Sequence, residues 1–162
     1  MRTCAKSVLS LFSKRNFVEI FFDTTVLVAA SEQGHPHYAR AWPALRRVAA
    51  GQDKGFMSVH SIAEVYASLT RLPVLPRIHP LEAVRIITDN ILAHFEVVPI
   101  GKEDYVEALN TVGNGGWSGA KIYDALLLRC AARCTVERIY TFNLGDFKQL
   151  APTSLKAIIC AP

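Results

Sequence analysis

The sequence predicts an α/β fold of three layers, α/β/α, around a central parallel sheet of about five strands. Short apolar runs alternate along the chain with longer segments whose apolar residues recur at three-to-four spacing. Strands that are covered by helices on both faces have continuous apolar runs, and such strands alternate with helices in parallel βαβ units. A length of 162 residues suits one domain with a sizeable core.

Five short apolar segments are expected to be the strands, because each is rich in β-branched or aromatic residues and ends near polar or turn residues. They are residues 17–22, 55–58, 95–100, 138–142 and 155–160.

Longer segments between these strands carry helical spacing of apolar residues. They are residues 37–50, 60–72, 80–95, 102–112 and 118–133. Pro43 within the first of them is expected to kink the helix or to delay its start. No internal repeat occurs, and neither residues 72–80 nor residues 113–116 have the composition of a domain linker. Residues 17–162 are therefore expected to form a single domain.

Residues 1–16 carry the chain's excess of positive charge. The formal net charge is +4, but this segment holds four basic residues and no acid, so the remaining 14 basic residues balance 14 acidic ones. Its apolar stretch, "SVLSLF", is shorter than the core of a signal peptide, and no small-residue cleavage site follows it. We expect residues 1–16 to be a disordered extension or an incorrectly assigned start. The net charge then gives no argument for nucleic-acid binding.

Membrane and secreted classes do not fit the composition. Half of the residues are hydrophobic, yet no uninterrupted apolar run approaches the roughly 18 residues of a membrane span. Cys4, Cys130, Cys134 and Cys160 lack the paired spacing of a small secreted scaffold. We expect a protein without a membrane segment, with reduced thiols, in the cytoplasm.

Four acidic residues fall at the same end of the predicted strand–helix units. Asp23 directly follows the first strand, and Asp146 follows the fourth strand closely. Glu64 and Asp124 lie in the first turns of two helices. Ligands of open parallel sheets bind beyond the carboxyl ends of the strands, so these acids are the best candidates for a site.

Each acid has a structural explanation when it is taken alone. An aspartate after a strand often starts a turn or caps a helix, and an acid in a first helical turn suits the helix dipole. Apolar neighbours surround Glu64 and Asp124, however, so both carboxylates are placed where isolated charges are costly. Four converging carboxylates repel one another unless protons or a cation compensate. Mg²⁺ and Mn²⁺ suit a site built of oxygen ligands alone.

Four stretches resemble, in order, the motifs of the PIN domain family, and within it the VapC-type ribonuclease toxins of bacterial toxin–antitoxin pairs. They are "FFDTTVLVAA", "SVHSIAEVYASLTRLP", "GGWSGAKIYDALLLRCA" and "TFNLGDF", and the likeness covers about residues 18–150. The positions that match the family's acidic quartet are Asp23, Glu64, Asp124 and Asp146. Thr141 and Asn143 match its supporting polar positions. Thr25 stands where the family usually has Asn or Ser, and as a hydroxyl it is expected to retune the geometry.

The resemblance implies a metal-dependent endoribonuclease that cleaves RNA, with Mg²⁺ or Mn²⁺ as its cofactor. Asp23, Asp124 and Asp146 would hold the metal ion. Glu64 would serve a second ion or orient the attacking water, and Thr24 and Thr141 would hold carboxylates through hydrogen bonds, although a backbone turn bond is an equal alternative for either hydroxyl.

The resemblance also implies a homodimer and an antitoxin partner. Residues 64–92 contain more apolar side chains than one sheet face is expected to cover, so we expect some of them to meet a second copy. These side chains are Val65, Leu69, Leu72, Val74, Leu75, Ile78 and Ile86.

Other interpretations stay open. A catalytically silent PIN-like module that binds RNA or a protein partner is the alternative function, with Thr25 as the sign of lost activity. His35 and His37 could bind metal or phosphate, yet solvated imidazoles are ordinary in such a polar connection. Lys121, near Asp124, could contact a substrate phosphate, although a surface lysine is the more ordinary state.

Overall fold

The computed structural model describes residues 17–162, so the extension expected over residues 1–16 lies outside the described residues. Five strands form one sheet in the order β3-β2-β1-β4-β5, and every neighbouring pair is parallel. The strands are β1 (Glu19–Phe22), β2 (Lys54–Ser58), β3 (Glu96–Val98), β4 (Arg138–Tyr140) and β5 (Ile159–Cys160). The predicted parallel sheet of about five strands is confirmed.

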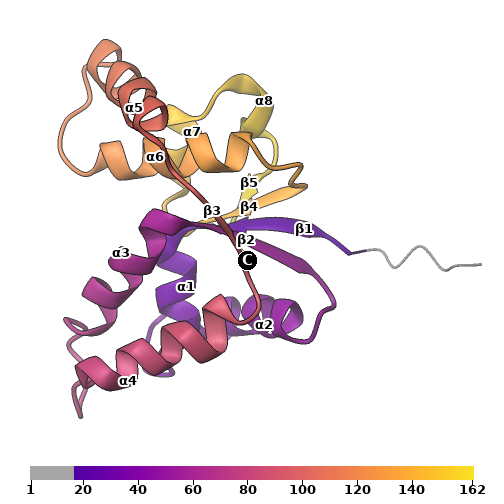
Figure 1. Ribbon diagram of the computed structural model, residues 1–162, viewed down its shortest axis with the longest axis vertical. Helices are drawn as coiled ribbons and strands as arrows, with labels where there is room; N and C mark the ends of the chain where they lie inside the picture. Colours follow the sequence, from indigo (N-terminus) through magenta and orange to yellow (C-terminus); the bar gives the residue numbers. More distant parts are fainter. Residues whose placement is uncertain (1–16) are drawn as a thin grey trace, which may run out of the picture.

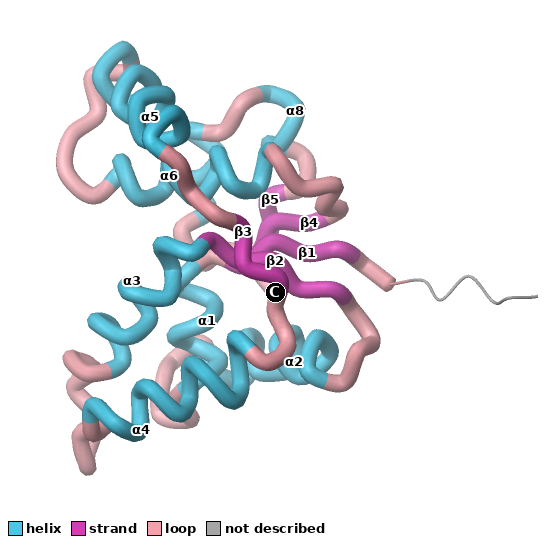
Figure 2. Tube along the Cα trace, viewed as in Figure 1, coloured by secondary structure: helices cyan, strands magenta, loops and turns pink. Residues whose placement is uncertain are grey.

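Helices cover both faces of this sheet and complete the three predicted layers (Figures 1 and 2). The layer below the sheet in Figure 1 holds α1 (Thr24–Ser31), α2 (Tyr38–Ala49), α3 (Val59–Leu69), α4 (Pro80–Arg85) and the π-helix η1 (Ile86–Leu92). The layer above the sheet holds α5 (Lys102–Asn114), α6 (Lys121–Ala132), α7 (Leu144–Leu150) and α8 (Thr153–Lys156).

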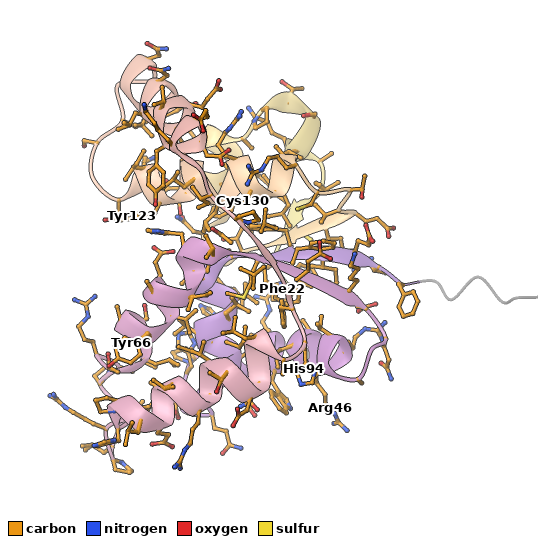
Figure 3. The ribbon with its side chains drawn as sticks, in the orientation of Figure 1. Phe22, Arg46, Tyr66, His94, Tyr123 and Cys130 are labelled. Atoms are coloured by element: carbon orange, nitrogen blue, oxygen red, sulfur yellow. The ribbon has the colours of Figure 1, made fainter. Side chains whose placement is uncertain are left out.

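The alternation of side chains along β1 explains how one strand serves two cores. Ile20 and Phe22 pack with the layer of α1 to α3, whereas Phe21 packs with the layer of α6 and α7. Figure 3 shows Phe22 and Cys130 on opposite sides of the sheet. All three β1 side chains are almost fully buried. Burial of each stabilises the fold by about 1.5–3 kcal/mol relative to exposure, which anchors the strand that ends at Asp23.

Three helices were missing from the sequence prediction. Six of the eight residues of α1 are buried, so this helix has no polar face that a periodic pattern could reveal. Helix α7 has only seven residues. Helix α8 takes the first part of the predicted strand 155–160, of which only Ile159–Cys160 pairs with β4. That strand prediction was wrong over most of its length.

Two predicted helices differ in detail from those observed. Helix α2 begins at Tyr38 and continues through Pro43, which is exposed to solvent. The proline therefore neither delays the start of the helix nor ends it. The predicted helix 80–95 is divided into α4 and η1, which follow one another directly.

Residues 64–92 do expose apolar side chains, namely Tyr66, Leu75, Leu81 and Val84, but most of the side chains named in the prediction pack inward. The side chains of Val65, Leu69 and Ile78 are buried in the core beneath the sheet. Leu72, Val74 and Ile86 are partly buried and pack against the same core. Leu75 is the exception, because 94% of its surface is exposed.

Cys130 is buried, Cys134 and Cys160 are partly buried, and no disulfide joins these three described residues. Cys4 lies outside the described residues. Over residues 17–162, every helix is too short or too polar to cross a lipid bilayer.

Candidate active site

The four predicted acidic residues converge on one cavity of about 300 Å³. Asp23 follows β1 directly, and Glu64 lies on α3, the helix that follows β2. Asp124 lies on α6, which precedes β4, and Asp146 lies on α7, which follows β4. Because all five strands are parallel, these connections meet at one edge of the sheet. The cavity is lined by Asp23, Thr24, Thr25, Glu64, Ser68, Ala120, Lys121, Tyr123, Asp124, Leu127, Asn143 and Asp146.

Asp23 is the most deeply buried acid of the cavity, with 2% of its surface exposed. It occupies the position before α1, yet its side chain makes no capping hydrogen bond. Instead, the hydroxyl of Thr141 donates to Asp23 Oδ2 at 2.8 Å, and the hydroxyl of Thr25 donates to the same oxygen. Burial raises the pKa of Asp23, although these two hydroxyls oppose the rise. The divergent residue Thr25 therefore contacts the carboxylate directly.

Glu64 is held by a neighbouring hydroxyl in the same way. Thr24 Oγ1 donates to Glu64 Oε2 at 2.8 Å and lies 2.9 Å from the hydroxyl oxygen of Ser61. Thr24 and Ser61 are both buried, so solvent competes little with these contacts. The contact joins the first residue of α1 to α3. The expected roles of Thr24 and Thr141 in holding carboxylates match these contacts.

Asp124 does not cap its helix, because α6 begins at Lys121 after Ala120. The next four residues, 125–128, are buried and fix this turn against the core. Asn143 Nδ2 donates to Asp124 Oδ2 at 3.0 Å. Burial, and then repulsion from Asp23, Asp146 and Glu64, raise the pKa of Asp124 to about 7.

Asp146 differs from Asp124 because a cation compensates its charge. Lys121 Nζ lies 2.9 Å from Asp146 Oδ1, and Asn143 Nδ2 donates to Asp146 Oδ2 at 3.2 Å. These hydrogen bonds, that of Lys121 first, hold the pKa of Asp146 below its usual value. The reading of Lys121 as an ordinary surface lysine missed this ion pair, because the two residues are 25 positions apart.

The aromatic side chain of Tyr123 lies beside the acids. Tyr123 is labelled on α6 in Figure 3 and lines the cavity while remaining largely exposed. Its ring stacks on His60 of α3, with ring centroids 5.3 Å apart and planes 19° apart. This contact links α3 and α6, the two helices that carry Glu64 and Asp124. Sequence reasoning missed it because the two rings are distant along the chain.

The donor set fits a hard divalent cation in its chemistry. Four carboxylates face one cavity, and burial, followed by repulsion from the other three carboxylates, raises the pKa of Asp124 there. Between residues 17 and 162, however, no three Asp, Glu, His or Cys side chains are already grouped as metal ligands. The carboxylates are arranged instead around the hydroxyls of Thr24, Thr25 and Thr141 and the amide of Asn143.

Comparisons with known proteins agree with this architecture. A family model described as PIN domain matches residues 20–151. The chain is similar to the crystal structure of Mycobacterium tuberculosis VapC20, a toxin that cleaves the sarcin–ricin loop, with 17% identity and a TM-score of 0.62, over 78% of this chain and 92% of that chain. It is also similar to VapBC2 from Rickettsia felis, solved with a DNA fragment from its promoter, with 17% identity and a TM-score of 0.59, over 89% of this chain and 98% of that chain. The sequence matches no curated protein.

Proposed function

The chain belongs to the PIN domain family, and we propose that it is a metal-dependent endoribonuclease that hydrolyses phosphodiester bonds of RNA. The observation that carries this proposal is the convergence of Asp23, Glu64, Asp124 and Asp146 on one cavity. Separate elements contribute these carboxylates at a cost in burial and in charge repulsion, which together raise the pKa of Asp124. Such repulsion is expected where the site is built for a cation and a phosphate substrate.

In this proposal Asp23, Asp124 and Asp146 hold Mg²⁺ or Mn²⁺. A cation bound there would polarise the phosphodiester and lower the pKa of a coordinated water. Glu64 orients the attacking water or serves a second cation.

The hydroxyls and the amide position these acids. Thr25 and Thr141 fix Asp23, Thr24 fixes Glu64, and Asn143 fixes Asp124 together with Asp146. Groups that are held in this way need little rearrangement during the reaction, which favours catalysis.

The alternative is a PIN-like module that binds RNA or a protein and does not cleave. The lack of a preassembled group of metal ligands among residues 17–162 is the observation in its favour. Cleavage and binding assays with the same protein separate the two functions.

The test incubates the purified chain with a total RNA preparation in Mg²⁺, in Mn²⁺ and in EDTA. Cleavage is expected in either metal, and it should vanish in EDTA and in the Asp124→Asn variant. Asp89→Asn, which changes an exposed aspartate of η1, is the matched control and should cleave normally. RNA binding without cleavage under every condition would support the silent module. Full cleavage after exhaustive chelation would contradict the metal-dependent mechanism.

We further propose that the chain is the toxin of a toxin–antitoxin pair, that it acts in the cytoplasm and that it forms a homodimer. The similarity to VapBC2 supports the antitoxin partner, because that structure contains a bound pair. A short neighbouring gene for a DNA-binding protein, whose product copurifies with this chain and suppresses its RNA cleavage, is the expected finding. A cleaving enzyme whose neighbouring gene product neither binds nor inhibits it would argue against the pair.

A further inference from the structure

A second cavity, of about 480 Å³, adjoins the acidic one. The two cavities share four lining residues and therefore lie side by side. These residues are Thr24, Thr25, Ser68 and Asn143. The residues that line the second cavity alone are Val28, His35, His37, Leu72 and Phe142. Its volume falls within the range of pockets for small organic ligands.

Flat rings form one wall of this second cavity. The rings of His37 and Phe142 are stacked, with centroids 4.3 Å apart and planes 17° apart. Phe142 directly precedes Asn143, whose amide holds two of the site carboxylates. The stacked pair therefore lies directly beside a residue of the acidic site. The faces that His37 and Phe142 turn toward each other are occupied, so a base would stack on an outer face of the pair, which any nucleobase can do because every base has a π-face.

His35 adds a neutral hydrogen-bond donor to the cavity. Its Nδ1 accepts the backbone N–H of His37 at 3.1 Å, so the ring proton of the neutral imidazole resides on Nε2. Burial lowers the pKa of His35, which keeps the ring neutral near pH 7. A single neutral donor suits the edge of a base better than a phosphate.

The apolar floor points to the same class of ligand. Val28 and Leu72 line the cavity and pack with the core below the sheet. Arg40 is the nearby cation, with its guanidinium carbon 5.7 Å from the Phe142 ring centroid. Its Nη2 already donates to the backbone oxygen of Pro162 at 3.2 Å. An apolar floor, a stacked wall and a neutral donor are the features of a base-binding pocket. They would leave the negative charge of a phosphate largely uncompensated.

We propose that the second cavity is a nucleobase subsite, in which His37 and Phe142 stack the base of a nucleotide that neighbours the phosphate in the acidic cavity. The identification of that nucleotide as part of an RNA substrate rests on the proposed function. The subsite gives a physical reason for the aromatic residue that precedes Asn143 and for the two histidines between α1 and α2, none of which the cleavage mechanism uses.

Binding is tested by proton NMR on the full chain in EDTA, with adenosine 5′-monophosphate as the probe and ribose 5-phosphate as its control. The chain has five histidines, which serve as resolved reporters. Adenosine monophosphate should move the ring protons of His35 and His37 through ring currents and saturate them at millimolar concentration. The rings of His79 and His94, which do not line the cavity, should not respond. Equal responses to ribose 5-phosphate, or responses that include His79 and His94, would overturn the subsite.

Two variants test the stacked wall. Phe142→Leu retains an apolar side chain but removes the flat ring, and we expect it to weaken adenosine monophosphate binding at least about fivefold. His37→Ala changes an exposed residue and should have a similar effect without disturbing the core. Tyr105→Leu removes a ring of which 42% is exposed on α5, outside both cavities, and should bind like the unmodified chain. Unchanged affinity in both Phe142→Leu and His37→Ala would remove the subsite.

A cleavage assay separates the failure of this proposal from the failure of the proposed function. A short RNA is compared with versions that carry an abasic nucleotide on either side of the cut. With the unmodified chain, the RNA that lacks the base on one side should be cleaved about tenfold more slowly than the intact RNA. With Phe142→Leu, the two RNAs should be cleaved at similar rates. Cleavage of both abasic RNAs at full rate would contradict the proposed subsite but not the proposed nuclease activity. If no RNA is cleaved, the nuclease fails, and the NMR titration still decides the subsite.

Discussion

Asn143 Nδ2 lies 3.0 Å from Asp124 Oδ2, so the connection after β4 holds the carboxylate of α6 in place. Removal of this amide in Asn143→Ala should lower kcat for RNA cleavage about 10–100-fold, because residues that orient metal ligands typically contribute that much. The melting temperature should change little, since Asn143 is only partly buried. Steady-state kinetics with a fluorogenic RNA measure this effect.

Asn90→Ala is the matched control for this variant, because Asn90 is an exposed asparagine of η1 away from the cavity. It should retain full activity. If Asn143→Ala and Asn90→Ala had equal kcat, the hydrogen bond to Asp124 would have no role in positioning the acid.

The raised pKa of Asp124 predicts that the metal-free protein loses stability as the pH rises. The pKa moves from 3.8 to about 7 on folding, so the folded chain holds a proton that the unfolded chain has released. This contribution is fully present below pH 3.8 and is lost as the pH rises through about 7. Its size, discounted because the side chain is partly exposed, is on the order of 1 kcal/mol, or about 2–4 °C in Tm.

Thermal unfolding in EDTA at pH 5 and pH 8 measures this dependence. The Asp124→Asn variant should show a smaller decrease in Tm between these pH values and a higher Tm than the unmodified chain at pH 8. Asp89→Asn should follow the unmodified chain. A lower Tm of Asp124→Asn at pH 8 would show that the carboxylate stabilises the fold after all.

Close packing around Gly55 predicts a strong effect of a single added methyl group. A Cβ at this position of β2 would lie 2.6 Å from a ring carbon of Phe95 and 2.8 Å from a methyl carbon of Val48. Gly55→Ala should therefore destabilise the protein by about 1–3 kcal/mol, measured by urea unfolding. Gly113→Ala in α5 is the control, because nothing lies within 4 Å of its added Cβ, and it should be neutral or stabilising by up to about 1 kcal/mol. Equal stabilities of the two variants would contradict the packing argument.

The proposed homodimer predicts a specific effect at Leu75, the exposed residue of the connection between α3 and α4. Leu75→Glu places a charge where an apolar contact is expected, and it should shift the chain from dimer to monomer in light scattering at tens of micromolar. Leu109→Glu on α5 is the control, because Leu109 is 58% exposed in the other helical layer. A monomeric unmodified chain at that concentration would exclude the dimer.

Local sequence patterns were enough to predict the parallel sheet and the end at which the acids gather. Short apolar runs identified four of the five strands to within about two residues at either end. Parallel strands bring their carboxyl ends to one edge, so Asp23, Glu64, Asp124 and Asp146 gather at that edge of a sheet that is parallel throughout. Local periodicity and one topological rule are sufficient for such conclusions.

The groups that those acids contact depend on how elements that are distant in the sequence pack together. The bond from Thr141 to Asp23 spans 118 positions of sequence, and the ion pair of Lys121 with Asp146 spans 25. The same holds for burial, because Val65 and Leu69 enter the core while Leu75 does not. Periodicity identifies an element and its apolar face, but the partner of a polar side chain depends on how distant elements pack. The cavity of His37 and Phe142 therefore became visible only when α1, α3 and the connection after β4 were in place.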